Sequence, residues 1–453
     1  MNQITKNIPG ESLQKAFLQG FDRLSERWNR QSPAGLHQIR KNALSGFEAM
    51  GLPTHRNEEY KYTHITRALD KNFSGEDILL LKDISVRQQH TEKAIENILP
   101  NIDANILVFI NGNFSEKLSR LVSPEKEMII KEFSQAYREH PALIEEHFAR
   151  YANYETDPFV ALNTAYGEYG SFIQVPDHQV VEKPVLLYFI SDTTAGKVVT
   201  HPRNLFLIGK NSQASFVEYF HSIGEQASYN NAVTEIVLED HAVVTYCKIE
   251  TESEKALHTG TTQVHQLAHS HFSATTIALS GGMIRNNLNI ALEAEGCEAH
   301  MFGLTLLKNK DHVDNHTVAD HRKPNAFSNE LYKNILDDSA TGVFNGKIYV
   351  RPHAQKTNAF QSNMNILLTD DAVINTKPQL EIWADDVKCS HGATTGQIDQ
   401  EQLFYLRTRG LSEETAKAML LYAFAIDILE NIKIPVLREQ LDEMISARLH
   451  KNF

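Results

Sequence analysis

The sequence predicts a mainly β protein in which a long parallel β-helix lies between two α-helical regions. Three observations predict this fold class. Helical periodicity of the apolar residues stops at about Phe172 and returns only after Gly396. Between these positions, short β-rich runs alternate with small polar turns. A weak internal repeat runs through the same region, which favours stacked coils over a sandwich.

The repeat consists of a polar or glycine turn, then a small residue, then a strand. Successive small residues lie 28, 55, 43 and 32 residues apart, and we interpret the two long intervals as two coils each. A coil of roughly 20 to 30 residues is in the range of solenoid repeats, and small residues at turns let coils stack at about 4.8 Å. Propeller blades are longer and carry stronger signatures. The small residues are Ala214, Ala242, Cys297, Ala340 and Ala372.

The flanking regions carry helix signals. Apolar residues recur at helical spacing over residues 12–29 and 38–50. After the core, Asp399 and Ser412 are placed as helix N-caps, and residues 416–429 are apolar almost all round, as in a buried helix. We therefore expect an N-terminal helical domain, a mixed α/β entry segment, the β-helix core and a C-terminal helical region, spanning 1–100, 101–170, 171–398 and 399–453.

Two local patterns refine this division. Asn111-Gly112 lies between apolar runs, so residues 105–114 are predicted to form a hairpin. Asparagines alternate with apolar residues over 285–289, 325–329 and 361–365. On stacked strands such side-chain amides bond their neighbours above and below, so we interpret these runs as structural ladders.

Composition narrows the class of protein. The 453 residues carry a net charge of −13, with histidine counted as neutral. Such a chain lacks the Lys and Arg excess by which proteins bind nucleic acid or an anionic membrane surface. No apolar run approaches the roughly 20 residues that span a bilayer, and the N-terminus does not read as a secretory signal. Three cysteines do not make a disulfide framework. We expect a cytoplasmic protein with reduced thiols.

The strongest candidate for chemistry is the pair Cys389 and His391. On a strand, residues two apart point to the same face. A thiolate and an imidazole together suit zinc, iron or an iron–sulfur species. Two ligands make only half a site, so the others must come from elsewhere or from another chain. A nucleophilic Cys–His pair and a partly buried cysteine beside a solvent histidine are the alternatives.

A histidine cluster is the second candidate. On a strand, His312, Asp314 and His316 alternate onto one face, which is either a metal face or a polar exterior stripe. We favour the stripe and keep His312 and His316 as metal candidates. His265, His269 and His271 pose the same question more weakly. The sequence contains no phosphate-binding loop, nucleophile elbow, CxxC or HExxH motif, so we expect neither nucleotide binding nor a complete local metal site.

Four segments together resemble the SufB/SufD family of iron–sulfur cluster assembly scaffold proteins, and are more similar to its SufD branch. The resemblance covers nearly the whole chain and is most specific from Arg285 to Phe424. The segments are EEYKYT at 58–63, RNNLNI at 285–290, KPQLEIWADDVKCSHGATTG at 377–396 and YLRTRGLSEETAKAML at 405–420.

The resemblance implies a right-handed parallel β-helix and a non-catalytic scaffold in a SufBCD-type complex. A SufB-type chain would pair at the end of the β-helix, where a transient iron–sulfur cluster or iron would be shared. There Cys389 and His391 match the family's Cys-x-His, and the histidine is the expected participant. A SufC-type ATPase would hydrolyse ATP and dock on the tail, and a homodimer of the isolated chain is a further expectation. The tail residues are Leu411, Ser412, Glu413, Glu414, Ala416 and Met419.

Two enzyme classes are the alternatives. A β-helix polysaccharide lyase would need a secretion signal and a groove of clustered Asp, Lys and Arg. A cytoplasmic cupin-like metalloenzyme would use His269, His271 and a distant histidine, and needs a second histidine-bearing strand beside the first.

Overall fold

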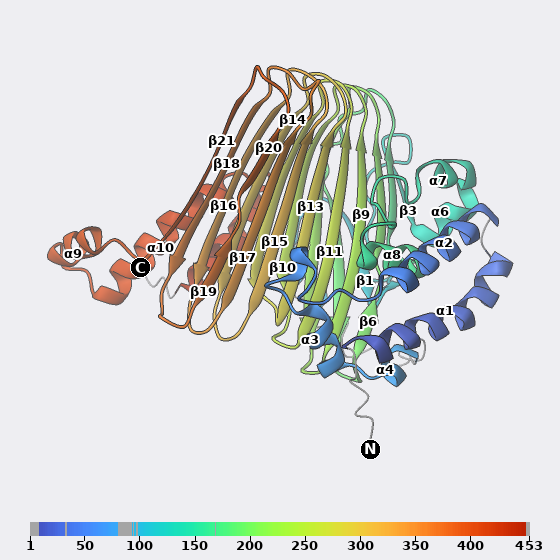
Figure 1. Cartoon of the computed structure of the whole chain (residues 1–453), viewed down its shortest axis with the longest axis horizontal. Coiled ribbons are helices and arrows are strands. Elements are labelled where there is room, and N and C mark those ends of the chain that lie inside the picture. The colour runs from blue at the N-terminus through green and yellow to red at the C-terminus, as the bar shows by residue number, and fades with distance from the viewer. Residues whose placement is uncertain are drawn as a thin grey trace.

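The computed structural model describes residues 9–31, 34–79, 93, 95–96, 98–167 and 169–449. One long stack of strands forms the centre of the molecule, with N-terminal helices on one side and C-terminal helices at the opposite end (Figure 1). The strands form two sheets, A and B, that enclose one continuous apolar core. The predicted β-helix is therefore confirmed as a solenoid of about eight turns.

Sheet A has ten strands in the order β2-β1-β5-β8-β10-β12-β14-β16-β18-β21. All neighbours pair in parallel except the hairpin β1–β2. Their bounds are β1 (Asn105–Ile110), β2 (Asn113–Phe114), β5 (Val185–Asp192), β8 (Gln213–Ile223), β10 (Val243–Thr251), β12 (His271–Ser280), β14 (Glu298–Leu307), β16 (Phe327–Leu336), β18 (Asn358–Leu367) and β21 (Lys388–Gly396).

Sheet B has eleven strands, with β19 and β20 pairing one after the other along β17. Its strands alternate along the chain with those of sheet A, so each coil contributes to both sheets. Their bounds are β3 (Ile129–Glu132), β4 (Ser171–Val175), β6 (Val198–Thr200), β7 (Arg203–Ile208), β9 (Ser228–Leu238), β11 (Ala256–Gln266), β13 (Met283–Leu292), β15 (His312–His321), β17 (Thr341–Val350), β19 (Val373–Thr376) and β20 (Gln379–Ile382).

One coil is 27 to 31 residues long, as the register through Val243, His271, Glu298, Phe327, Asn358 and Lys388 shows. This corrects one step of the predicted repeat. Ala242 and Cys297 precede strands of sheet A and lie two coils apart, whereas Ala340 precedes a strand of sheet B. The 43-residue interval is therefore one and a half coils. Small buried residues occur at both corners, and the sequence repeat does not distinguish them.

Polar ladders line part of the solenoid interior. Asn286 Nδ2 donates to Asn315 Oδ1 at 3.3 Å, and Asn334 Nδ2 donates to Asn365 Oδ1 at 2.7 Å. Each bond joins residues that face each other on adjacent parallel strands. The predicted stacking of side-chain amides is thus confirmed for the runs 285–289 and 361–365, where it satisfies groups that would be costly to bury without partners. In the run 325–329, Asn325 instead donates to Glu295 at 2.6 Å.

The N-terminal region covers the outer face of sheet B near its first coils (Figure 1). Gly51, at φ +67°, ends α2 in the conformation that glycine adopts without strain. Asn111 and Gly112 have φ of 50° and 82°, as a tight hairpin turn requires. The helices are α1 (Glu11–Gln31), α2 (Ala34–Met50), η1 (Glu58–Tyr60), α3 (Ile65–Asn72), α4 (Gly75–Leu79), α6 (Phe133–Glu139), α7 (Pro141–His147) and α8 (Pro158–Tyr166).

The predicted hairpin is part of the solenoid rather than an appendage before it. Strand β1 pairs in parallel with β5 from Asn105 to Ile110, so sheet A begins inside the segment 101–170 that we expected to precede the core. Its alternate side chains enter the solenoid core or the cluster on the outer face of sheet A.

The C-terminal region consists of α9 (Gln400–Thr408), α10 (Glu413–Leu429) and α11 (Pro435–Arg448). Asp399 accepts hydrogen bonds from Glu401 N and Gln402 N, and Ser412 accepts one from Thr415 N, so both predicted N-caps are confirmed. Helices α10 and α11 pack on the outer face of sheet A. Lys333 of β16 anchors α10 by donating to the Phe424 carbonyl at 2.9 Å and to Asp427 at 2.5 Å.

No helix among the described residues is both long enough and apolar enough to cross a bilayer.

Candidate functional site

The C-terminal end of the solenoid is open. Strand β21 is the last strand of sheet A, and β19 with β20 is the last rung of sheet B. One backbone edge of β21 therefore has no strand beside it in the described chain. Large apolar side chains are exposed near this end: Val373, Ile382 and Trp383 are 46%, 40% and 49% exposed, and Phe360 and Met364 are also exposed. Unpaired strand edges and exposed apolar side chains are both features through which chains can pair with one another.

Cys389 and His391 lie on this edge strand and share one face. Cys389 pairs with Ala359 of β18, and His391 pairs with Gln361. Ala359 and Gln361 are buried, whereas Phe360 between them is exposed, so this face of the sheet looks into the solenoid interior. The two side chains therefore lie at the mouth of the solenoid rather than on its outer wall.

The two groups differ in accessibility. The Cys389 side chain packs partly against the solenoid core, and this burial raises the pKa of its thiol above the ordinary value. His391 is exposed. A thiol must lose its proton to bind a metal, whereas a neutral imidazole does not. Of the two side chains, His391 is the more accessible to a group that approaches from solvent. The thiols of Cys247 and Cys297 are buried, and burial raises the pKa of Cys247 to about 12.

The mouth holds two side chains of types that bind metals, Cys389 and His391. Among the described residues, no group of three His, Cys, Asp or Glu side chains is arranged to hold a metal ion. Structural zinc and iron–sulfur sites use about four ligands, so Cys389 and His391 fit such a group only with ligands from outside this part of the chain.

The tail residues expected at an ATPase interface lie around the start of α10. Ser412, Glu413 and Glu414 are exposed, and Glu413 pairs with Lys417 at 2.8 Å. Leu411 and Met419 are partly exposed, but Ala416 is fully buried and therefore unable to contact a partner directly.

Helix α9 carries two exposed aromatic residues, Phe404 and Tyr405, that the helical apolar pattern does not single out. Phe404 and Tyr405 are 68% and 57% exposed, the largest exposures among the exposed large apolar side chains of the tail. Leu403 on the same helix is buried, so the two aromatic rings lie on the face turned away from the core. Helix α9 extends away from the solenoid (Figure 1). The exposure of these two rings could have been inferred from the sequence, because Phe404 and Tyr405 lie outside the apolar spacing of Leu403 and Leu406.

His312 and His316 lie together on the outer face of sheet B, as the strand alternation predicted, but they are buried under the EEYKYT segment. His312 Nε2 lies 2.9 Å from Thr63 Oγ1. His316 lies between two carboxylates, 3.0 Å from Asp314 and 3.3 Å from Glu59. The favoured interpretation as an exterior stripe is therefore wrong about solvent exposure, because a segment some 250 residues upstream covers these side chains.

The docked segment completes a dense charge network. Arg285 is buried, donates to Asp314 at 2.7 Å and to the Glu59 carbonyl at 2.5 Å, and lies over the Tyr60 ring. Burial alone would raise the pKa of Asp314, but the Arg285 guanidinium and His316 hold it well below its usual range. The hydrogen bond with His316, together with Lys347, lowers the pKa of Glu59 to about 2.

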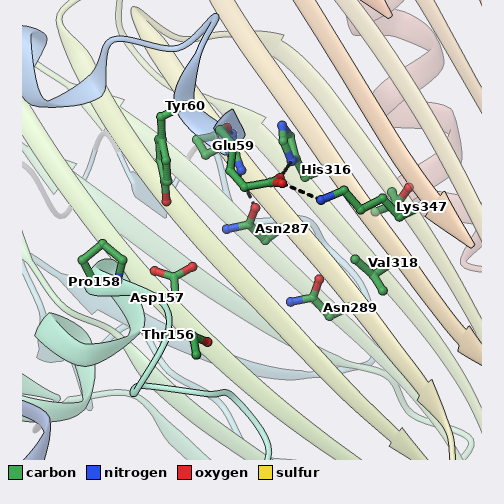
Figure 2. Close-up of a pocket in the computed structure, with 12 residues that line it drawn as sticks. Glu59, Tyr60, Thr156, Asp157, Pro158, Asn287, Asn289, His316, Val318 and Lys347 are labelled. Carbon is green, nitrogen blue, oxygen red and sulfur yellow. Dashed lines mark hydrogen bonds and ion pairs between the residues drawn. The ribbon is translucent and has the colours of Figure 1, made fainter. Parts of the chain in front are cut away.

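A cavity of about 180 Å³ opens beside this network. Figure 2 shows Glu59 reaching between His316 and Lys347, with Asn287, Asn289 and Asp157 around the remaining space. Lys347 Nζ lies 2.6 Å from Glu59. The charges are already neutralised within the chain, so the network is suited to docking the segment and does not gather free metal ligands.

The histidines of the cupin-like alternative do not converge on one site. His269 lies on a turn and stacks on His241 at 5.1 Å, whereas His271 begins β12 and lies 3.0 Å from Glu298. Cupins are antiparallel double-sheet proteins, and the parallel solenoid does not provide that barrel.

Comparisons with known proteins place the whole chain in one family. The SufBD core domain of the SUF iron–sulfur cluster assembly system matches residues 189–424, and the SufBD N-terminal region matches residues 11–187. A SufBD family assembly protein of Synechocystis is 32% identical over 90% of both chains. The assembly protein SufD of Escherichia coli is 30% identical over 88% of this chain and 90% of its own. SufD of Bacillus subtilis is 24% identical over 97% of this chain and 98% of its own. The solenoid, its open mouth and these matches together show that the chain belongs to the SufBD family of iron–sulfur cluster assembly proteins.

Proposed function

We propose that this chain is the SufD-type subunit of a SufBCD complex and contributes half of a cluster-assembly site. The observation that carries the proposal is the position of Cys389 and His391 on an unpaired edge strand, facing the mouth of the solenoid. A SufB-type chain that pairs with this edge would bring the missing ligands. The iron–sulfur cluster is then cargo, assembled at the interface and passed on. His391 is the principal ligand, and Cys389 has a secondary role because its thiol is partly buried.

The edge itself supports a protein partner. Parallel or antiparallel strand addition needs a free row of backbone N–H and C=O groups, which β21 offers. The exposed Ile382 and Trp383 supply apolar contact area beside it. In the absence of the SufB-type chain the same edge suits a second copy, so the isolated chain is expected to dimerise.

His391→Ala is expected to remove most of the iron and sulfide from the co-purified heteromer while leaving the heteromer intact. The side chain is exposed on the edge strand, so its loss costs a ligand and little folding free energy. The measurement is iron and acid-labile sulfide per complex after anaerobic reconstitution. Ser390→Ala is the matched control, because Ser390 lies on the same strand with its side chain on the opposite face. Loss of the heteromer, or an unchanged iron content, would refute the proposed role of His391 as a ligand.

We further propose that the SufC-type ATPase docks on α9 and the start of α10. Phe404 and Tyr405 form an exposed aromatic pair, and aromatic residues dominate the binding energy of many protein interfaces. The predicted contacts of Leu411, Ser412, Glu413, Glu414 and Met419 lie near them in sequence. ATP hydrolysis by that partner is the step that would move the tail and open or close the cluster site.

Phe404→Glu together with Tyr405→Glu is expected to weaken ATPase binding by up to roughly 1,000-fold, since two interface anchors are each worth about 2 kcal/mol. Binding is measured by surface plasmon resonance with the purified ATPase. The matched control is Phe360→Glu, an exposed aromatic of the outer wall near the other proposed interface. Equal loss in both variants would indicate a general surface effect and refute the assignment of α9.

A further inference from the structure

The register of sheet A places His391 at the end of a buried polar column. His391 of β21 faces Gln361 of β18, and Gln361 faces Glu330 of β16. Gln361 and Glu330 are 2% and 1% exposed, so both side chains point into the solenoid interior. In-register parallel strands lie about 4.8 Å apart, which puts the imidazole one rung above the amide.

The amide of Gln361 is half satisfied. Its Nε2 donates to Glu330 Oε2 at 2.7 Å, which fixes the orientation of the amide. Its Oε1 is buried, and no donor among the described residues bonds to it. A buried acceptor without a donor costs about 1–3 kcal/mol. This oxygen therefore needs a donor, and the exposed His391 on the next rung carries one.

The neighbouring rungs lack this complementarity. Cys389 faces Ala359, which has no polar side chain, and Ala393 faces Asn363. The Asn363 Oδ1 already accepts a hydrogen bond from Asn365 at 2.8 Å. Gln361 Oε1, the buried acceptor without a donor, therefore faces His391, whose ring can donate a hydrogen bond to it.

We propose that Gln361 is a positioning residue for His391, accepting a hydrogen bond from one imidazole nitrogen so that the other nitrogen is presented to the cluster. The inference rests on the proposed function, in which His391 is a ligand. The two side chains are not hydrogen-bonded in the structure, so the proposal requires the exposed His391 side chain to adopt a rotamer that brings one ring nitrogen to Gln361 Oε1. Histidine ligands commonly donate their second ring N–H to a carbonyl or carboxylate, which fixes the tautomer. Glu330 acts one step further away, by holding the Gln361 amide with its oxygen free.

The test uses the tautomer of His391 in the full chain labelled with ¹⁵N-histidine. Long-range ¹H–¹⁵N spectra are recorded at pH 8, because burial raises the pKa of Glu330 to about 7 and its carboxylate should be ionised. The His391 signals are assigned by their absence from His391→Ala. We expect one tautomer in the unaltered chain and a mixture of two in Gln361→Met, which keeps the side-chain length but removes the acceptor. Asn363→Leu, which removes a buried amide facing Ala393, should leave the His391 signals unchanged.

A second variant, Glu330→Leu, and a second measurement, iron affinity, distinguish failure of the Gln361 contact from failure of the ligand role of His391. Glu330→Leu leaves Gln361 in place but releases its amide, and should also give the mixture. In the heteromer, Gln361→Met is expected to lower iron affinity about 10- to 100-fold. A mixture of tautomers in the unaltered chain, or one unchanged by Gln361→Met, overturns the inference in favour of a buried water on Oε1. If His391→Ala keeps its iron, the proposed function fails, whereas the tautomer result still reports on the Gln361 contact.

Discussion

Ala393→Pro is expected to weaken strand pairing with the SufB-type chain roughly 100-fold while leaving the fold of this chain unchanged. Lys388 N donates to Thr357 O of the preceding coil, so the N–H groups of alternate residues from Lys388 onward face β18. The intervening residues, including Ala393, direct their N–H groups to the free edge. Proline at such a position loses no bond within the chain, because the missing N–H faced outward.

The loss of affinity follows from the geometry of strand addition. A partner strand that lies along β21 needs the Ala393 N–H as a donor, and the proline ring occupies the space where a partner carbonyl would approach. The unmade bond and the stranded acceptor together cost about 3 kcal/mol, or roughly 100-fold in affinity. Affinity is measured by surface plasmon resonance, and folding by the melting temperature.

Ala393→Val is the matched control for this experiment. It enlarges the same side chain with a strand-favouring residue but keeps the N–H group. The valine variant should bind the partner nearly as well as the unaltered chain. Full affinity in the proline variant would show that the partner does not pair through the backbone of β21, and the exposed Ile382 and Trp383 would then have to carry the interface by side-chain contacts alone.

Arg285→Met is expected to destabilise the protein by about 3–5 kcal/mol, because it removes the guanidinium that pairs with the buried Asp314 carboxylate. The side chains of Arg285 and Asp314 are 3% and 1% exposed, so water does not replace the lost partner. The same change removes the hydrogen bond to the Glu59 carbonyl and the contact with the Tyr60 ring. We expect a lower midpoint in urea unfolding and faster proteolysis of the segment 58–63.

Two further variants test whether the loss of stability comes from the unpaired buried charge or from any weakening of the contacts of segment 58–63. Arg285→Met combined with Asp314→Asn should recover much of the stability, since no uncompensated charge remains. Lys347→Met removes the pair with Glu59, whose side chain is 43% exposed, and should cost less than about 1 kcal/mol. Equal losses from Arg285→Met and Lys347→Met would contradict the view that the buried pair holds the segment.

The β-solenoid was predictable because each coil requires certain residue types at fixed places in the local sequence. Small residues such as Ala242, Cys297 and Ala340 lie at tight corners where larger side chains would hold the coils apart. Two kinds of corner use the same residues, however, so the spacing between Cys297 and Ala340 did not reveal which sheet each begins. The amide ladders were predictable for the same reason, because a one-residue alternation on a strand fixes the face on which a side chain lies.

The long-range parts of the site were not predictable from one sequence. The shared face of Cys389 and His391 follows from their spacing, but that it looks into the interior depends on the register with Ala359 and Gln361. The burial of His312 and His316 depends on a segment far upstream that no local pattern connects to them. Neither the register nor this burial can be read from the spacing of residues in the sequence, because each depends on contacts between distant segments that do not recur periodically.

The docking of the EEYKYT segment has a consequence for the order of events during synthesis. Glu59 and Glu58 bond to Lys347 and Lys377, which lie 288 and 319 residues further along the chain. At roughly 5–20 residues per second, the ribosome exposes these lysines about 15 to 65 s after the segment itself. The N-terminal helices can therefore pack on the first coils early, whereas the segment 58–63 cannot form these two bonds until the late coils of the solenoid have been synthesised. The segment 58–63 is thus fixed in place only on a chain whose solenoid is almost complete.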